Sequence, residues 1–202
     1  MTEGTTIAVG DVLDGKYEIT DILGEGAMGV VYLALHRRLQ RTVALKTLRA
    51  EIAGDSEIVA RFEREARAAS AIGHANIVQI FDAGGGPVPY LVMENLRGES
   101  LGALLEREGP LAVDRAIGLC KQVLAGLEAA HQVGIIHRDL KPDNIFVCRE
   151  GDDAELVKIL DFGISKILDK AGAALLGDAA ATRAGMVMGT PLYMSPEQAH
   201  GR

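Results

Sequence analysis

Polar and charged side chains are concentrated in one short stretch of the chain, "IIHRDLKPDNIFV", which spans residues 135–147. An apolar pair precedes them and an apolar triplet follows, so the stretch lies between segments that are typical of a core. Burying charge beside such segments costs several kcal/mol per ion unless partners are supplied. The stretch is therefore either a surface turn or a chemical site.

Asp139, Lys141 and Asn144 have the chemistry of a phosphate-transfer site. Asp139 offers a carboxylate to orient a hydroxyl, and Asn144 offers an amide oxygen for a hard cation such as Mg²⁺. Lys141 can meet an anion on the same side of the loop, which Pro142 prevents from becoming a helix. In "ILDFG", Asp161 ends an apolar strand, where it could present a second oxygen ligand to the same ion.

A glycine-rich turn, "GEGAMGVV", matches the pattern G-x-G-x-x-G-x-V at Gly24, Gly26, Gly29 and Val31. Alone, this pattern is shared with dinucleotide-binding folds and with plain tight turns. Here β-branched residues follow it directly in place of a helix. The glycines therefore predict a hairpin whose backbone amides can close over phosphates.

Lys46 and Glu65 are predicted to form an ion pair. Lys46 ends "VALK", and by itself it would be read as a solvated lysine on an edge strand. Glu65 lies on the apolar stripe of a predicted helix, between Phe62 and Ala69, where an inward carboxylate needs a cation to offset its desolvation. Lys46, on the sheet that such a helix would cover, is the obvious candidate.

The predicted elements change type along the chain. After a loose leader over the first ten residues, two strands joined by the glycine turn are expected at 17–37, and single strands at 41–48, 76–85 and 89–96. One amphipathic helix, with apolar residues spaced by three and four, is expected from 56 to 73. Two helices at 100–109 and 112–134, the latter stopped at Gly134, precede strand-like runs at 135–147 and 154–163. The Ala- and Gly-rich segment 169–184 is predicted as a mobile loop in preference to a helix.

Composition bounds the class of protein. The chain has 202 residues and 48% apolar content, enough for one domain or two small lobes. Its net charge of −7 argues against a general nucleic-acid or anionic-membrane binder. There is no signal segment, and no apolar run reaches the roughly 18 residues of a membrane helix. Cys120 and Cys148, without CxxC spacing, are predicted to be reduced core thiols, which fits a cytoplasmic location.

Taken in order, the motifs make the chain resemble the eukaryotic-type serine/threonine protein kinases, in the style of their bacterial members. They are "GEGAMGVV", "VALK", "FEREA" with Glu65, "HRDLKPDN", "DFG" and "GTPLYMSPE", and they cover Tyr17 to about Gln198. The resemblance implies an α+β, protein-kinase-like fold of two lobes. A leader would occupy residues 1–16, an N-lobe of five strands and one helix residues 17–96, and a partial C-lobe with the catalytic loop and activation segment residues 97–202.

The resemblance also implies an activity, the transfer of the ATP γ-phosphate to Ser/Thr hydroxyls of proteins, with autophosphorylation, using ATP and Mg²⁺ or Mn²⁺. Lys46, paired with Glu65, would hold the α- and β-phosphates. Asp139 would act as base or orient the hydroxyl, and Lys141 would neutralise the transferred group. Asn144 and Asp161 would bind the metal. ATP would be bound by Gly24, Glu25, Gly26, Ala27, Gly29, Val31, Ala44, Lys46, Met93 as gatekeeper, Glu94 and Leu96 of the hinge, Phe146 and Leu160.

Regulation and partners follow from the same resemblance. Arg138, directly before Asp139, suggests control by phosphorylation of the activation loop, with Thr182 as the phosphosite ahead of Thr190 and Ser165. His137 and Phe162 are expected to pack together in the core. The expected partners are protein substrates and a second copy for trans-autophosphorylation, in the cytoplasm or as the cytoplasmic domain of a membrane-anchored kinase.

Three readings stay open at the level of sequence. Family members continue with further helices beyond the last matched motif, so the chain is read as a fragment of a longer kinase. It is then an active protein kinase, or a catalytically weak or inactive nucleotide-binding or regulatory fragment. A small-molecule phosphotransferase of related fold is the third reading, which "HRDLKPDN" together with "GTPLYMSPE" disfavours.

Overall fold

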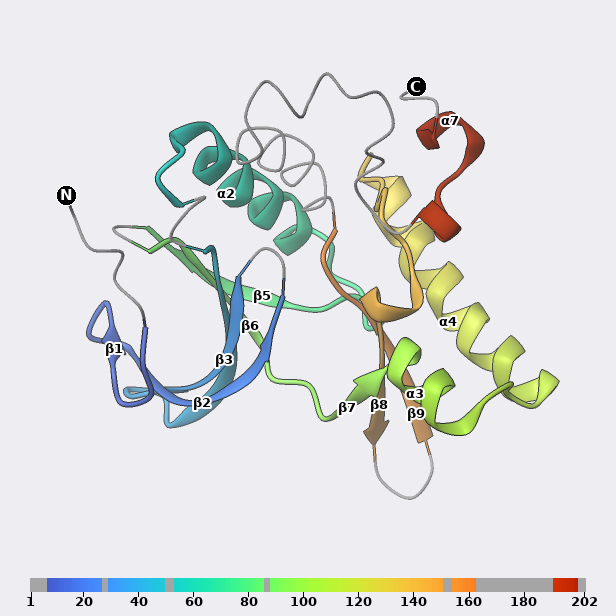
Figure 1. Ribbon diagram of the computed structural model, residues 1–202, viewed down its shortest axis with the longest axis horizontal. Helices are drawn as coiled ribbons and strands as arrows, with labels where there is room; N and C mark the ends of the chain where they lie inside the picture. Colours follow the sequence, from blue (N-terminus) through green and yellow to red (C-terminus); the bar gives the residue numbers. More distant parts are fainter. Residues whose placement is uncertain are drawn as a thin grey trace. The chain divides into compact units, whose positions relative to one another are not determined.

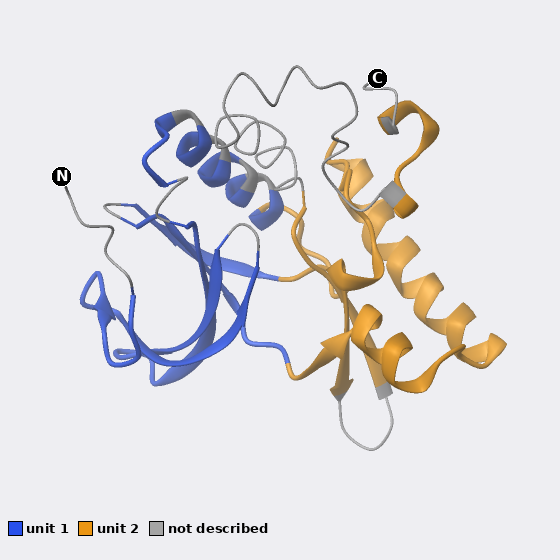
Figure 2. Ribbon diagram, in the orientation of Figure 1, with its two compact units in different colours: residues 1–70, 79–96 blue, residues 71–78, 97–202 orange. Residues whose placement is uncertain are grey.

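The computed structural model describes residues 7–26, 29–49, 53–85, 88–150, 154–162 and 191–199. The chain forms two compact units (Figure 2): unit 1 comprises residues 1–70 and 79–96, and unit 2 comprises residues 71–78 and 97–202. The sequence placed a boundary after Leu96. The segment 71–78, which the sequence assigned to the N-lobe, belongs to unit 2.

Unit 1 is built on an antiparallel sheet of six strands in the order β1-β2-β3-β4-β6-β5 (Figure 1). Short turns join β2 to β3 and β3 to β4, so these strands pair as consecutive hairpins. β6 pairs with β4 on one side and with β5 on the other, so β5 is the edge strand. The strands are β1 (Val12–Leu13), β2 (Tyr17–Glu25), β3 (Val30–His36), β4 (Arg41–Thr47), β5 (Ile80–Gly84) and β6 (Tyr90–Glu94).

One face of this sheet carries the core of unit 1. Alternate residues of β2, β3, β4 and β6 are buried together, as the two-residue period of a strand requires. They are Tyr17, Ile19, Tyr32, Ala34, Val43, Leu45, Tyr90 and Val92. Ile7 joins the cluster, and its carbonyl accepts a hydrogen bond from the Tyr32 hydroxyl at 3.3 Å. Ile7, in the predicted leader, is thus packed into the core, whereas Val9 is 58% exposed.

Helix α2 (Ser56–Ser70) contacts β5. Its buried residues are Ile58, Phe62, Ala66 and Ala69, one face of a 3.6-residue helix, as the apolar spacing predicted. The helix ends three residues before Gly73, the predicted terminator.

Unit 2 contains a smaller antiparallel sheet, β7-β8-β9, and the helices that accompany it. Ser100 begins the first helix, because its side chain accepts a hydrogen bond from the Ala103 N–H at 3.1 Å. The longest helix ends at Gln132, and Gly134, the predicted terminator, follows two residues later with a φ of 76°, a left-handed conformation that suits glycine. The elements are β7 (Gly98–Ser100), α3 (Leu101–Glu108), α4 (Val113–Gln132), η1 (Pro142–Asn144), β8 (Ile145–Glu150), β9 (Ala154–Ile159), η2 (Pro191–Tyr193) and α7 (Pro196–Ala199).

Three sequence predictions in unit 2 need correction. The strand expected from 135 begins only at Ile145, and Ile136 is exposed, because η1 and the loop before it interrupt the apolar pattern. Pro142 does not exclude a helical turn: it begins η1, since the first residue of a helical turn needs no backbone N–H. Cys148 is buried, but Cys120 lies on the exposed side of α4 and is not a core thiol.

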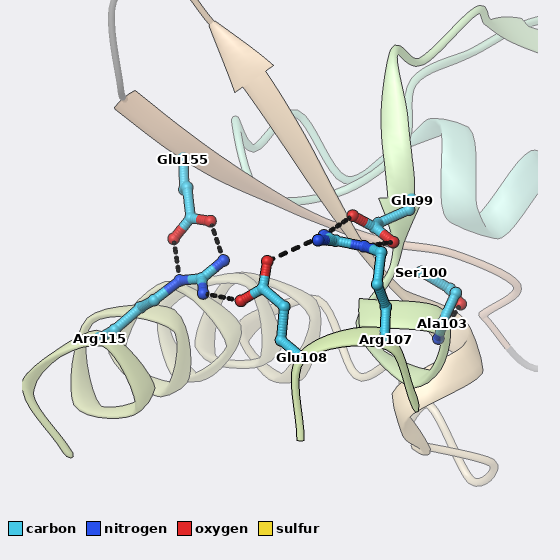
Figure 3. Close-up of polar contacts among 7 residues, drawn as sticks. All are labelled: Glu99, Ser100, Ala103, Arg107, Glu108, Arg115 and Glu155. Atoms are coloured by element: carbon cyan, nitrogen blue, oxygen red, sulfur yellow. Dashed lines mark hydrogen bonds and ion pairs between the residues drawn. The ribbon is translucent and has the colours of Figure 1, made fainter. Parts of the chain in front are cut away.

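A chain of ion pairs ties α3, α4, β7 and β9 together (Figure 3). Arg107 of α3 pairs with Glu99 and Glu108, and Arg115 of α4 pairs with Glu108 and with both carboxylate oxygens of Glu155 in β9. Because guanidinium groups bind carboxylates in a fixed fork geometry, this arrangement sets how α4 lies on β9. Among the described helices, none combines the length and the apolar character that crossing a membrane requires.

Candidate active site

Four of the predicted nucleotide-binding residues share the sheet face opposite the core cluster: Val31, Ala44, Lys46 and Met93. Val31 pairs across the strands with Lys46, and Ala44 pairs with Met93, which makes two neighbouring cross-strand rows. The strand period places them on this face, because the residues between them (Tyr32, Leu45 and Val92) belong to the core. Ala44 and Lys46 are buried, whereas Val31 and Met93 are partly exposed.

The glycine-rich turn is confirmed as a hairpin between β2 and β3. Gly24 and Glu25 end β2, and the Gly26 N–H donates to the Gly29 carbonyl at 2.9 Å. A Cβ on Gly24 would meet no atom within 4 Å, whereas a Cβ on Gly29 would lie 1.7 Å from the Thr47 carbonyl oxygen. Packing within the chain therefore explains the glycine at 29. It does not explain Gly24, where open space suits the close approach of a ligand.

Arg49 is a part of this turn that the sequence analysis missed. Its guanidinium donates twice to the Gly26 carbonyl, from Nε at 3.1 Å and from Nη2 at 2.9 Å. The contact holds the hairpin turn against the end of β4. The one sequence signal for this contact is the presence of a cation three residues after Lys46.

Lys46 lies in β4 and is only 8% exposed. The side chain of Glu65, its predicted partner, lies outside the residues that the structure describes, and so does Ala27 of the glycine-rich turn.

The segment predicted as a hinge begins within β6. The Glu94 N–H donates to the Gln79 carbonyl at 3.0 Å, and a Glu94 carboxylate oxygen accepts from the Gln79 N–H at 2.7 Å. The Glu94 N–H is thus used within unit 1 and is not the donor to a base. Leu96, partly exposed, is the last residue of the unit.

In unit 2 the loop before β8 brings Asp139, Lys141 and Asn144 together, as their spacing predicted. Lys141 Nζ lies 3.2 Å from Asp139 Oδ2. The Asn144 amide nitrogen donates to the Asp139 carbonyl at 2.8 Å and to Asp139 Oδ2 at 3.2 Å. The Asp139 carboxylate thus lies between a cation and an amide donor, which fix its direction.

The end of β9 is joined to the same loop. The Leu160 N–H donates to the Asn144 carbonyl at 2.9 Å, and Asp161 follows directly. Arg138 and Asp161 both have positive φ, at 67° and 54°, a region that non-glycine residues occupy rarely and at a cost. Such strain, within this loop at Arg138 and after β9 at Asp161, is typical of a functional site. Phe146, in β8, pairs with Lys158 of β9 and is partly exposed.

His137 is confirmed as a core residue. It is 2% exposed and packs against Phe162, with ring centroids 4.8 Å apart. Burial lowers the pKa of His137, which favours the neutral ring. Its Nδ1 accepts from the Asp139 N–H at 3.3 Å, so the proton is on Nε2, which donates to the Leu160 carbonyl at 2.8 Å. The neutral ring thus connects the loop to the end of β9.

The donors of this loop fit Mg²⁺ better than a softer ion. With its nitrogen donating to Asp139, Asn144 presents its amide oxygen as the remaining ligand atom, and Asp161 adds a carboxylate. Mg²⁺ prefers oxygen ligands and takes only one or two from the protein, with phosphates and water completing the shell. Among the residues that the structure describes, no cluster of three or more His, Cys, Asp or Glu side chains could hold a metal by itself.

Comparison with known proteins assigns the family. The protein kinase domain family matches residues 17–202. The chain belongs to the protein kinase family. Among curated proteins it is 44% identical to serine/threonine-protein kinase Pkn3 of Myxococcus xanthus, over 99% of this chain and 36% of that protein. It is 41% identical to serine/threonine-protein kinase PknB of Mycobacterium tuberculosis, over 94% of this chain and 29% of that protein.

A solved structure supports the fold. The kinase domain of PknI from Mycobacterium tuberculosis matches with a TM-score of 0.69 and 31% identity, over 79% of this chain and 64% of that chain. The predicted α+β kinase fold is therefore confirmed. The kinase chain studied spans about a third of the length of the curated relatives it matches.

Some predicted positions of this kinase lie outside the described residues. They are the activation-segment residues Ser165, Thr182 and Thr190 and the mobile loop predicted at 169–184. Beyond them, α7 contributes a contact that the sequence analysis missed: the Gln198 amide donates to the Arg138 carbonyl. This bond supports the strained residue before Asp139.

Proposed function

We propose that this kinase chain transfers the γ-phosphate of ATP to Ser/Thr hydroxyls of proteins, and that it phosphorylates itself. The observation that carries the proposal is the position of Asp139 between Lys141 Nζ and the Asn144 amide. A carboxylate fixed in this way can accept a hydrogen bond from a substrate hydroxyl and receive its proton.

Each polar residue of the loop then has a role. Asp139 orients and deprotonates the hydroxyl. Lys141, next to that carboxylate, places positive charge where the phosphoryl group passes. Asn144 and Asp161 would hold Mg²⁺, or Mn²⁺ in its place, which when bound neutralises the phosphate charge. The hydrogen bond from Leu160 to Asn144 keeps the two oxygen ligands in register.

The residues of unit 1 are proposed to bind ATP. Lys46, in the buried row of β4, would hold the α- and β-phosphates with Glu65 as its partner, and the glycine-rich turn would cover the phosphates. The support is the shared sheet face and the open space at Gly24. The adenine would lie against Val31, Ala44 and Met93, with Glu94 and Leu96 at its edge.

Substrate class and regulation are proposed from the motifs. Lys141 in "DLKPDN" and Thr190 in "GTPLYMSPE" favour Ser/Thr over Tyr as the acceptor. Thr182 is the proposed site of trans-autophosphorylation by a second copy, in the cytoplasm or in the cytoplasmic part of a membrane-anchored kinase.

One observation favours a second candidate, a nucleotide-binding fragment with little turnover. Val113, Ile117 and Leu124 form an exposed apolar stripe on α4, at 73%, 48% and 64% exposure. Apolar area of this kind marks a surface that packs against something. If unit 2 is poorly ordered without that packing, ATP binding would persist while turnover fell.

A substrate comparison tests the proposal. The chain is incubated with Mg²⁺ and radiolabelled ATP and offered a generic basic protein or a sugar, beside the Asp139→Asn variant. Label on the protein, absent with the variant, is the expected result. Label on the sugar alone would contradict a protein kinase, and ATP binding without transfer would favour the fragment.

A further inference from the structure

Gln122 of α4 makes hydrogen bonds to the backbone of β9 of the kind that a neighbouring strand would make. Its Oε1 accepts from the Val157 N–H at 2.9 Å, and its Nε2 donates to the Glu155 carbonyl at 3.0 Å. The same oxygen accepts from the Asn76 amide at 3.1 Å. A single amide side chain thus satisfies two backbone groups on the β9 edge that β8 does not pair.

Asn76 continues this contact toward the end of β9. It is 8% exposed, and its amide donates to the Val157 carbonyl at 2.9 Å. Its own carbonyl accepts from the Ile159 N–H at 2.8 Å, and the Val78 N–H donates to the Ile159 carbonyl at 3.0 Å. Gln122 and Asn76 together form what we call the amide clasp, which closes the outer edge of β9.

Gly126 permits α4 to come close enough for the clasp. It lies one helical turn after Gln122, and a Cβ there would stand 2.8 Å from Ile159 Cδ1 and 3.2 Å from the Asn76 carbonyl oxygen. A side chain at 126 would therefore make Ile159 shift and would crowd the Asn76 carbonyl. The glycine favours the close contact between α4, Asn76 and β9.

The clasp ends immediately before the proposed metal ligand. Ile159 is its last backbone partner, Leu160 bonds to the Asn144 carbonyl, and Asp161 is next. Because side chains alternate along a strand, any slip of β9 would move Asp161 away from its partner position. A strand held at both edges cannot slip without breaking several hydrogen bonds at once.

We propose that Gln122, acting with Asn76, is a positioning residue for the Asn144 and Asp161 metal ligands. Gln122 touches neither metal nor nucleotide in this role; it fixes β9 so that Asp161 stays in register with Asn144. The inference rests on the proposed function, in that it assumes these two residues hold the metal.

The direct test replaces Gln122 with methionine, which keeps an unbranched side chain of similar size and removes all three hydrogen bonds. Gln132→Met is the matched control, since Gln132 is an exposed glutamine at the end of the same helix. Mn²⁺ binding is measured by electron paramagnetic resonance with a non-hydrolysable ATP analogue present. Amide hydrogen exchange at Leu160 is measured on the metal-free chain.

Gln122→Met is expected to weaken Mn²⁺ binding on the order of tenfold, the lower end of what loss of an outer-shell partner costs, and to speed exchange at Leu160. Gln132→Met is expected to change neither. Gln122→Glu, which keeps the acceptor oxygen for Val157 and Asn76, is expected to restore most of the affinity. Unchanged Mn²⁺ affinity in Gln122→Met, even with lowered thermal stability, would show a merely structural role and overturn the proposal.

A second variant keeps the test decisive if Gln122→Met does not fold. Gly126→Ala retains every polar group but pushes α4 away from Asn76. It is expected to weaken Mn²⁺ binding, as Gln122→Met is. Unchanged Mn²⁺ binding would refute the positioning role of the amide clasp. Failure of the proposed function looks different. The unaltered chain would then bind no Mn²⁺ with nucleotide, and Asp161→Asn would change nothing.

Discussion

At the scale of single residues, the loop from His137 to Asn144 explains why charge lies next to apolar segments. Asp139 has Lys141 and the Asn144 amide as partners, and the buried His137 is neutral and bonded on both ring nitrogens. The opposite charges of Asp139 and Lys141 thus face each other within the chain before any nucleotide is bound.

Asp161→Asn tests the proposed metal ligand. Asparagine tolerates the positive φ of this position, so the fold should persist and the melting temperature should stay close to that of the unaltered chain. Turnover should fall by about 10²-fold or more, since even outer-shell changes cost 10–100-fold in metal affinity. Steady-state rates across a range of Mg²⁺ concentrations check this, and unaltered turnover would remove Asp161 from the metal role.

The buried His137 predicts a loss of stability in acid. Burial lowers its pKa in the folded chain, so the unfolded chain binds the proton more readily. Stability is then fully present above the unfolded pKa of about 6.5 and is lost as the pH falls toward the folded value, by at most about 1.4 kcal/mol per pH unit. Urea unfolding between pH 8 and pH 5 measures this. His137→Gln cannot titrate and should show a flatter profile; equal slopes would exclude His137 as the cause.

At the scale of elements, the glycine-rich turn and helix α4 have different structural roles. The turn joins β2 to β3 and leaves open space at Gly24, while α4 binds β9 through Arg115 and Gln122. The turn is the proposed ligand-binding element, whereas α4 holds a strand in place.

Two glycine substitutions should separate ligand binding from packing. Gly24→Ala adds a methyl group in open space, so it should leave the melting temperature nearly unchanged and raise the KM for ATP. Gly29→Ala drives a Cβ into the Thr47 carbonyl and should destabilise unit 1 by about 1–3 kcal/mol, as overpacking does. Thermal melts and ATP titrations check the pair; the opposite pattern would contradict the proposed phosphate loop.

The ion pairs between α4 and β9 predict a salt-dependent effect. Arg115→Lys loses the two-pronged bond to Glu155 and should lower the urea midpoint, more at low than at high ionic strength. Arg37→Lys, whose partner Glu18 is a single contact at 3.7 Å, is the matched control and should change little. Equal shifts in the two variants would mean that the chain of ion pairs adds nothing.

At the scale of the whole molecule, local sequence patterns predicted the positions of strands and helices well. Strand-like runs of apolar and β-branched residues located β2, β3, β4, β5 and β6, and apolar residues spaced by three and four located α2. The motif residues Asp139, Lys141 and Asn144 also came together as their short spacing required.

What sequence reasoning missed depends on contacts between distant residues. Ile7 packs against Tyr32, and Asn76 bonds to Gln122 and Val157, none of them near neighbours in the chain. Gln122 was not singled out from the sequence, where it is one polar residue beside the buried stripe of Leu119, Val123 and Gly126. Cys120 was misplaced because α4 has a second apolar stripe, which the structure leaves exposed.

The central claim is that Asp139 supports phosphoryl transfer by this chain. Intact mass measured before and after incubation with Mg²⁺ and ATP, beside the Asp139→Asn variant, tests it most directly. The account predicts added masses of about 80 Da per phosphate, the increment of phosphorylation, in the unaltered chain and none in the variant. Equal phosphorylation of both chains would contradict the role of Asp139, and no added mass in either, with ATP still bound, would contradict catalysis by this chain.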